Sequence, residues 1–233
     1  MAGEGLVIPT NCTAIDELLE GGLRSGEVLL IYGEAETGKS TLALQLAVNC
    51  SLMGHEALFV DCEDFVRPGR LAAMSGQEPE ALGRLTIARP SSYEEFIRVL
   101  ESLPGLVRAG VVLVAIDTIT TFYRLRLSEG ADSFRLNREL GFYVALLAQL
   151  AHEEGVCIVM TSQVRAKLDQ AGGHEDLEPV ANRILRYWSD LVLRLRLTGR
   201  PGLRMAVLEK GRTRRPQPPR LFRISEEGIV DAY

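Results

Sequence analysis

One short motif constrains the fold of this chain more than any other feature. Residues 33–40 read GEAETGKS and fit the pattern GxxxxGK[ST]. They follow a short apolar run at residues 27–32 (EVLLIY) and precede a stretch at residues 41–50 whose composition favours a helix. A strand, a glycine-containing loop and a helix in this order are the start of a βαβ unit, so the motif predicts an α/β fold.

The chemistry of this loop follows from its glycines and its lysine. Glycines allow the backbone amides to turn inward around a phosphate chain, and the N-terminus of the following helix adds a favourable dipole. We expect Lys39 to contact the β- and γ-phosphates of ATP and Ser40 to bind Mg²⁺. The predicted nucleotide-binding residues here are Gly33, Glu34, Ala35, Glu36, Thr37, Gly38, Lys39, Ser40 and Thr41.

The remaining elements alternate in type for most of the chain. Strands are predicted at residues 57–60, 85–88, 111–116 and 156–160, and helices at residues 92–103 and 133–153. Strands that alternate with helices form a parallel sheet covered on both faces. Short strands at residues 191–197, 203–208 and 220–224 have only turn residues between them, which predicts antiparallel strands at the C-terminal edge. We expect one domain, a P-loop NTPase core, over residues 1–233.

Acidic residues follow two of the predicted strands. Asp117 ends the apolar strand at residues 111–116, where a carboxylate supports Mg²⁺ through water in P-loop enzymes. The alternative is an aspartate that caps the next helix. Glu63 and Asp64 end the strand after the P-loop helix, and the carboxyl ends of parallel strands line one crevice. We expect Glu63 to polarise the attacking water; solvated acids at a strand end are the alternative.

A neutral amide follows a third strand. Gln163 follows the predicted strand at residues 156–160 after Thr161 and Ser162, at the same predicted edge of the sheet. An amide there can contact the γ-phosphate and report its loss to the segment beyond. An ordinary polar strand end is the competing interpretation, and the residues alone do not decide between the two.

The charge of the chain is unevenly distributed. The net charge is −5, yet residues 191–223 contain ten basic residues and one acid, so this segment carries +9 and the rest of the chain −14. Lysine is rare, with only Lys39, Lys167 and Lys210 among 26 basic residues. Lys210 and Arg212 form a K-x-R pattern that either stabilises phosphate charge in a neighbouring subunit's site or is a solvated basic hairpin tip.

Other classes of protein are not supported by the composition. The longest apolar run that matters, residues 111–116, is too short to span a bilayer, and the N-terminal residues have no basic and apolar signal pattern. We expect a cytoplasmic protein that does not contact membranes. The four cysteines are dispersed and lie beside apolar residues, so they are expected to be buried free thiols.

Five motifs in order resemble the RecA superfamily, most closely the archaeal RadB-like recombinase paralogues. IPTNCTAIDELLEGGLRSGEVLLIYGEAETGKST resembles the entry to the ATPase core, and FVDCEDFVRPGRL the segment with the catalytic glutamate. AIDTITTFYR is similar to the metal-binding strand and DNA-binding loop one, and TSQV to the γ-phosphate-sensing segment before loop two. LEKGRTR and FRISEEGI resemble the closing strands.

The resemblance implies roles for individual residues. Glu63 and Gln163 correspond to the catalytic glutamate and the γ-phosphate sensor, and Arg70 to an arginine that contacts adenine. Loop one, residues 123–132, and loop two, residues 164–180, would bind DNA, preferably single-stranded. The cations expected to contact it are Arg124, Arg126, Arg165 and Lys167, or those of the basic C-terminal segment.

Departures from the family pattern point to an accessory member. No FxxA sequence for tethering subunits precedes the P-loop, and the resemblance to the ATPase core starts near Ile8. Cys62 replaces a more usual threonine and Gly69 an acid. We therefore expect a slow Mg²⁺-dependent ATPase of DNA repair and recombination that binds DNA or a recombinase, with possible homo-oligomers but no filaments through that tether. The alternatives are a KaiC-like regulatory ATPase acting on proteins, and a structural subunit without useful turnover.

Overall fold

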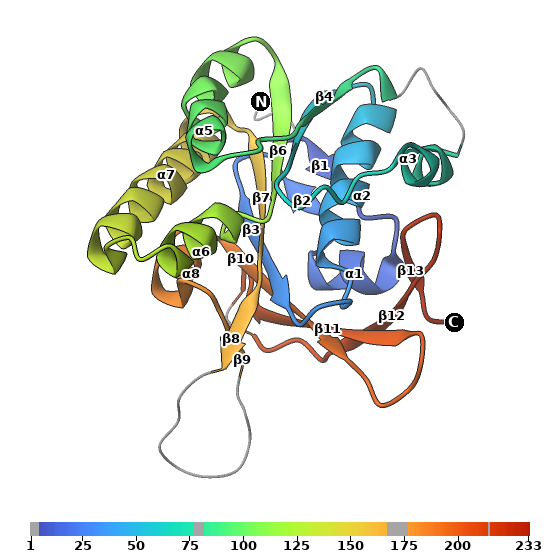
Figure 1. Ribbon diagram of the computed structural model, residues 1–233. Helices are drawn as coiled ribbons and strands as arrows, with labels where there is room; N and C mark the ends of the chain where they lie inside the picture. The colour runs from blue at the N-terminus through green and yellow to red at the C-terminus, as the bar shows by residue number, and fades with distance from the viewer. Residues whose placement is uncertain (1–4, 77–81, 167–176, 214) are drawn as a thin grey trace.

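The molecule is built on one large twisted sheet (Figure 1). The computed structural model describes residues 5–76, 82–166, 177–213 and 215–233. Within them the strand order is β13-β12-β11-β10-β3-β7-β6-β4-β5. Its strands are β3 (Val28–Gly33), β4 (Glu56–Asp61), β5 (Leu85–Ala88), β6 (Val111–Asp117), β7 (Cys157–Ser162), β10 (Leu191–Leu197), β11 (Leu203–Lys210), β12 (Arg220–Ile224) and β13 (Ile229–Asp231).

The direction of the strands changes at β10. From β10 to β5 every neighbouring pair is parallel, whereas β10–β11, β11–β12 and β12–β13 are antiparallel. This confirms the predicted α/β fold with a parallel sheet and antiparallel strands at its C-terminal edge. Two small two-stranded sheets are added: β1 (Val7–Ile8) with β2 (Leu23–Arg24), and β8 (Val164–Ala166) with β9 (Leu177–Pro179).

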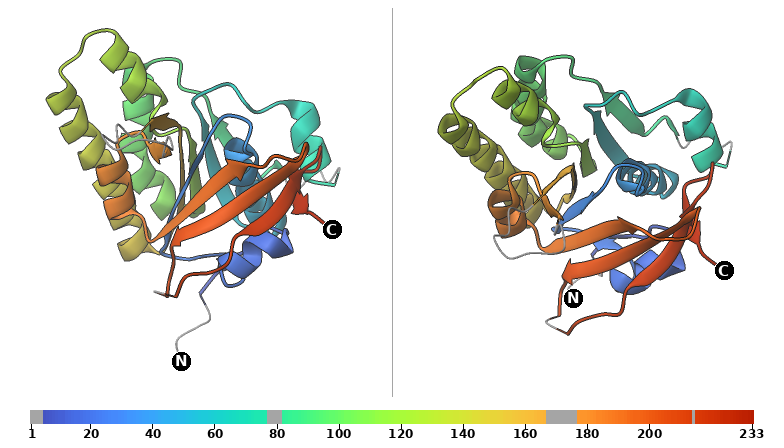
Figure 2. Two further views of the ribbon diagram at one scale, coloured as in Figure 1. Left: turned by 90° about the horizontal axis from the view of Figure 1, so that it is seen from below. Right: turned by 60° about the horizontal axis from the view of Figure 1, so that its bottom comes forward.

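Helices cover both faces of the sheet (Figure 2). They are α1 (Thr13–Leu18), α2 (Lys39–Leu52), α3 (Pro68–Met74), α5 (Tyr93–Arg108), α6 (Thr121–Ser128), α7 (Ser133–Glu154) and α8 (Asn182–Trp188). Side chains of β3 alternate between two apolar clusters, because successive residues of a strand point to opposite faces. Leu29 and Ile31 pack in the cluster with α1 and α2, while Leu30 and Tyr32 pack in the cluster with α5 and α7.

The ends of the long helices follow local sequence rules. Ser92 accepts a hydrogen bond from the Glu95 amide (3.1 Å) at the start of α5, and Ser91 donates to the Glu95 carboxylate (2.7 Å). This arrangement is a variant of the capping box, in which the Glu95 carboxylate reaches back to Ser91 instead of to the N-cap residue Ser92. Asp132 caps α7 by accepting from the Phe134 amide (3.0 Å), and α7 ends at Gly155 with φ of 74°.

The structure corrects the prediction for loop one. Residues 123–128, the larger part of the predicted loop, belong to α6, because Phe122 and Tyr123 are only 5% and 8% exposed and pack against the α5–α7 core. Loop two is described at its ends, where β8 and β9 pair; residues 167–176 between them lie outside the described part. In the described chain, no helix is long and apolar enough to cross a membrane.

Candidate nucleotide-binding site

A pocket of about 750 Å³ lies at the carboxyl ends of β3, β4, β6 and β7. The segments that follow these four strands meet at the same edge, as expected for a parallel sheet. The residues that line the pocket are Gly33, Ala35, Glu36, Gly38, Lys39, Ser40, Thr41, Glu63, Phe65, Arg70, Thr118, Arg124, Gln163, Val164, Arg204 and Ile224. The predicted residues Glu63, Arg70 and Gln163 and most of those of the P-loop therefore converge here, whereas Glu34, Thr37 and Asp117 are not among the lining residues.

Two glycines of the P-loop are fixed by their surroundings. A Cβ on Gly33 would lie 2.1 Å from the Leu195 carbonyl oxygen of β10, and one on Gly38, where φ is +100°, 2.9 Å from Ile224. Only glycine fits where backbone or side chains approach this closely. The strands β10 and β12 thus pack directly against the P-loop and restrict its conformation.

Lys39 is held inside the P-loop. Its ammonium donates to the carbonyl oxygen of Glu34 (2.7 Å), and the Thr37 hydroxyl donates to the same carbonyl (2.8 Å). Lys39 is 9% exposed, and its burial lowers the pKa of the ammonium, while Asp117 and Glu63 act in the opposite direction. A buried ammonium with one carbonyl partner keeps donors available for a phosphate in the pocket.

Ser40 and Asp117, the residues predicted to bind Mg²⁺, lie side by side. The Ser40 hydroxyl donates to Asp117 Oδ1 (3.0 Å), and the Thr161 hydroxyl donates to the same oxygen (2.5 Å). Asp117 is fully buried and its Oδ2 has no hydrogen-bond partner, while burial raises the pKa of the carboxyl to about 6. Oxygen donors with an unsatisfied carboxylate oxygen fit Mg²⁺, which prefers carboxylate, hydroxyl and water ligands.

Glu63 and Gln163 meet although they are 100 residues apart. The Gln163 amide donates to Glu63 Oε1 (2.6 Å), and the Thr121 hydroxyl donates to the same oxygen (2.8 Å). Asp64 instead is exposed and pairs with Arg67 at 3.0 Å, outside the pocket lining. Of the two acids that the sequence offers, the geometry places Glu63 at the pocket.

Arg70 closes the pocket from α3. Its Nη2 donates to the Thr41 hydroxyl (2.8 Å), and its guanidinium stacks over the Phe65 ring at 5.0 Å from the centroid. The segment before α3 is ordered by Asp61, which accepts from the amides of Phe65 (2.8 Å) and Val66 (3.0 Å). A guanidinium held over an aromatic ring at the edge of the pocket is suited to contact a planar base.

This geometry agrees with three comparisons to known proteins. Residues 3–232 match the family described as Rad51. The chain belongs to the Rad51 family. The DNA repair and recombination protein RadB of Thermococcus onnurineus is 35% identical over 229 residues, 97% of each chain, and that of Methanobrevibacter smithii is 31% identical over 227 residues, 96% of this chain and 95% of the relative. A crystal structure of the RadB recombinase superposes with a TM-score of 0.80 at 33% identity, over 97% of this chain and all of that one.

Two arginines of this Rad51-family chain line the pocket without having been predicted there. Arg204 on β11 donates through Nε to the Glu36 carbonyl (2.9 Å) and so supports the P-loop. Arg124 on α6, which the sequence assigns to a DNA-binding loop, lies at the same pocket. Neither belongs to a motif near the P-loop in sequence, and only strand order brings β11 there.

Lys210 and Arg212 lie outside the lining of this pocket. The Lys210 ammonium donates to the carbonyls of Ser189 and Arg186 at the end of α8. Arg212 forms a two-pronged ion pair with Glu27 (2.5 and 2.6 Å) and donates to the carbonyls of Leu19 and Gly22. Within this chain both cations hold parts of the fold together. To serve a neighbour's site, as expected from the sequence, they would have to break these bonds.

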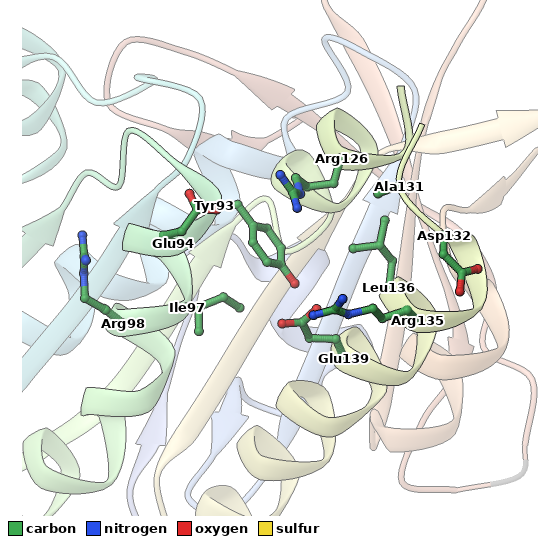
Figure 3. Close-up of a pocket in the computed structure, with 10 residues that line it drawn as sticks. All are labelled: Tyr93, Glu94, Ile97, Arg98, Arg126, Ala131, Asp132, Arg135, Leu136 and Glu139. Atoms are coloured by element: carbon green, nitrogen blue, oxygen red, sulfur yellow. The ribbon is translucent and has the colours of Figure 1, made fainter. Parts of the chain in front are cut away.

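The other predicted cations are dispersed. Arg126 lies at a separate cavity of about 600 Å³ between α5 and α7, where Figure 3 shows it beside Tyr93; the guanidinium is 5.6 Å from the ring centroid. It pairs with Glu129 at 3.6 Å. Arg165 is described only by its backbone in β8, and Lys167 lies outside the described residues. All four cysteines are free thiols as predicted; three are buried, whereas Cys62 is only half-buried.

Proposed function

We propose that this protein is a Mg²⁺-dependent ATPase that acts as an accessory protein of DNA repair and homologous recombination. The observation that carries the proposal is the convergence of Lys39, Ser40 and the Glu63–Gln163 pair at one pocket, with the buried Asp117 bonded to Ser40 beside it. Its relatives include proteins named DNA repair and recombination protein RadB. The whole chain, residues 1–233, acts in this proposal as one ATPase core.

The P-loop supplies binding and charge stabilisation. Its amides and Lys39 hold the β- and γ-phosphates, and Ser40 with Asp117 would hold Mg²⁺, which neutralises charge on the transferred phosphate. Arg70, stacked on Phe65, positions the base. Arg204 fixes the Glu36 carbonyl and thereby the shape of the loop. Once nucleotide is bound, these groups are already in place, so the chemical step itself requires little further reorientation.

Glu63 is the proposed general base. Its Oε1 accepts two hydrogen bonds, from Thr121 and Gln163, which orient the carboxylate towards the pocket. A γ-phosphate in the pocket competes with Glu63 for the Gln163 amide, because its anionic oxygens are strong acceptors, as the carboxylate is. Gln163 directly precedes β8, so its change of partner moves the base of the loop-two hairpin. Glu63, released from the amide, then accepts the proton of the attacking water.

DNA is the proposed partner of the carboxyl edge and of the C-terminal strands. Four exposed arginines of the basic segment have no ion-pair or hydrogen-bond partner for their guanidinium groups in the described part of the chain: Arg196, Arg200, Arg215 and Arg223. Unpaired surface arginines suit the phosphates of single-stranded DNA. A recombinase is the proposed protein partner.

A turnover assay with and without single-stranded DNA tests the proposal. We expect slow Mg²⁺-dependent ATP hydrolysis that DNA changes and that Lys39→Ala removes. Salt-dependent DNA binding separates this function from a regulatory ATPase that acts only on proteins. Absence of ATP binding in the folded wild-type protein would disprove the proposal.

A further inference from the structure

A single carboxylate joins the P-loop strand to α8. Glu209, near the end of β11, accepts a hydrogen bond from the Tyr32 hydroxyl (2.8 Å) and from Arg186 Nη1 on α8. Arg194 Nη1 lies 3.8 Å from the other carboxylate oxygen, and its guanidinium is 5.8 Å from the centre of the Tyr32 ring. The Glu209 side chain is 21% exposed, so water screens these interactions only in part.

Tyr32 connects this cluster to the nucleotide site. It is 2% exposed, lies at the end of β3 and directly precedes Gly33 of the P-loop. Gly33 is in turn packed against the Leu195 carbonyl, so the strand end has little room to move independently of β10. A shift of the P-loop on nucleotide binding therefore acts on the Tyr32 hydroxyl and on its acceptor, Glu209.

The other end of the cluster reaches the loop-two hairpin. Lys210, next to Glu209, donates to carbonyls at the end of α8, so two adjacent residues of β11 hold this helix of about two turns. The helix starts shortly after β9, and the Val180 amide donates to the Gln163 carbonyl (2.9 Å). The hairpin β8–β9 is thus held at its first strand by Gln163 and at its second by α8.

We infer that Glu209 is a positioning residue that makes α8, and with it the β9 end of loop two, follow the P-loop when nucleotide binds. The inference rests on the proposed nucleotide binding and adds a second connection beside Gln163. Gln163 reports on the γ-phosphate at the β8 end, and the Tyr32–Glu209–Arg186 cluster reports on the P-loop at the β9 end. A coupling of this kind requires that the nucleotide site and the β9 end of loop two bias the same element, and α8 is that element.

The chain contains its own probe of α8. Trp188 is its only tryptophan and the last residue of the helix, with its ring 5.0 Å from the exposed Tyr187 ring. Excitation of tryptophan therefore reports on α8 alone. We expect ATP with Mg²⁺ to change Trp188 emission in the wild-type protein, measured beside an independent determination of ATP affinity by equilibrium dialysis.

Two variants test the cluster. Glu209→Gln keeps an acceptor for Tyr32 and removes the charge that holds Arg186 and Arg194, and Tyr32→Phe removes only the hydroxyl. Both are expected to bind ATP with an affinity changed by less than about tenfold and to lose most of the emission change. Glu17→Gln is the matched control, since it breaks an ion pair with Arg220 (2.8 Å) between α1 and β12 and should keep the full change.

The possible results separate this inference from the proposed function. Wild-type protein that binds ATP without any change at Trp188, or variants that retain the full change, would overturn the inference while leaving the ATPase proposal intact. Wild-type protein that binds no ATP would overturn both. If Glu209→Gln does not fold in a thermal melt, Tyr32→Phe decides. Hydrogen exchange of the α8 amides, slowed by nucleotide in wild type and unaffected in Tyr32→Phe, is the second readout.

Discussion

The P-loop and the C-terminal hairpin, which is formed by β11 and β12 and carries Lys210 and Arg212, share a pattern of cations in sequence and differ in structure. Each contains one of the chain's three lysines, followed closely by residues suited to phosphate. Lys39 is buried with a single carbonyl partner and faces a pocket. Lys210 already holds two carbonyls of α8, and Arg212 is committed to Glu27 and to two further carbonyls. A lysine or arginine in such a pattern therefore indicates phosphate binding only when its hydrogen bonds within the chain leave some of its donors free.

The largest effect is expected at the P-loop. Lys39→Ala should abolish ATP binding or reduce turnover by about 100-fold or more, since a charge-stabilising donor is lost. The free energy of unfolding should change little, because a buried charge disappears together with only one hydrogen bond. Nucleotide binding and a thermal melt measure the two quantities. Unchanged affinity and turnover in the folded variant would remove the P-loop from its proposed role.

The second effect separates Glu63 from Asp64. Glu63→Gln should retain ATP binding and lose turnover by a factor on the order of 10² to 10⁴, as for removal of a general base. Asp64→Asn is the control, because Asp64 is exposed and pairs with Arg67. Single-turnover hydrolysis with saturating ATP measures the step. A loss in Asp64→Asn alone would show that the other acid is the base.

The third effect tests whether the C-terminal hairpin is structural. Arg212→Ala should lower the free energy of unfolding by about 3 kcal/mol, because it leaves the largely buried Glu27 carboxylate without its partner. Nucleotide affinity should persist at a temperature where the variant is folded. Arg200→Ala, an exposed arginine without an ion pair in the described chain, is the control.

The opposite interpretation of this hairpin has its own signature. If Lys210 and Arg212 serve a neighbour's site, a variant with both replaced by alanine regains turnover when it is mixed with Lys39→Ala protein. Each subunit then supplies what the other lacks. Such recovery would show that the bonds within the chain give way in an assembly.

The smallest effect concerns DNA. Arg196→Ala combined with Arg223→Ala should weaken single-stranded DNA binding, with the log–log salt slope reduced by about one per lost contact. Turnover without DNA should be unchanged, since both arginines lie outside the pocket. Binding isotherms at several salt concentrations measure the slope. An unaltered slope would shift the proposed DNA contacts to the loop-one and loop-two cations.

Most of the fold could be predicted because its signals are local. The motif at residues 33–40, the apolar strands and the capping box at Ser92 each depend on neighbouring residues. Where packing decides, prediction failed: α6 forms because Phe122 and Tyr123 fit the core, and α8 is too short to show a periodic pattern. The Glu63 choice rested on its place at a strand end, and the geometry supports it.

The sequence by itself determined the P-loop, the parallel sheet and the residues at the strand ends, because in a parallel sheet every strand end faces one edge. Only the tertiary structure decided which cations are free. Arg204 came to the nucleotide pocket and Arg212 to Glu27 because strand order and register, set by packing over the whole chain, place residues far apart in sequence side by side. Charge in a sequence has no partner until the chain folds, and the partner fixes whether that charge binds a ligand or holds the fold together.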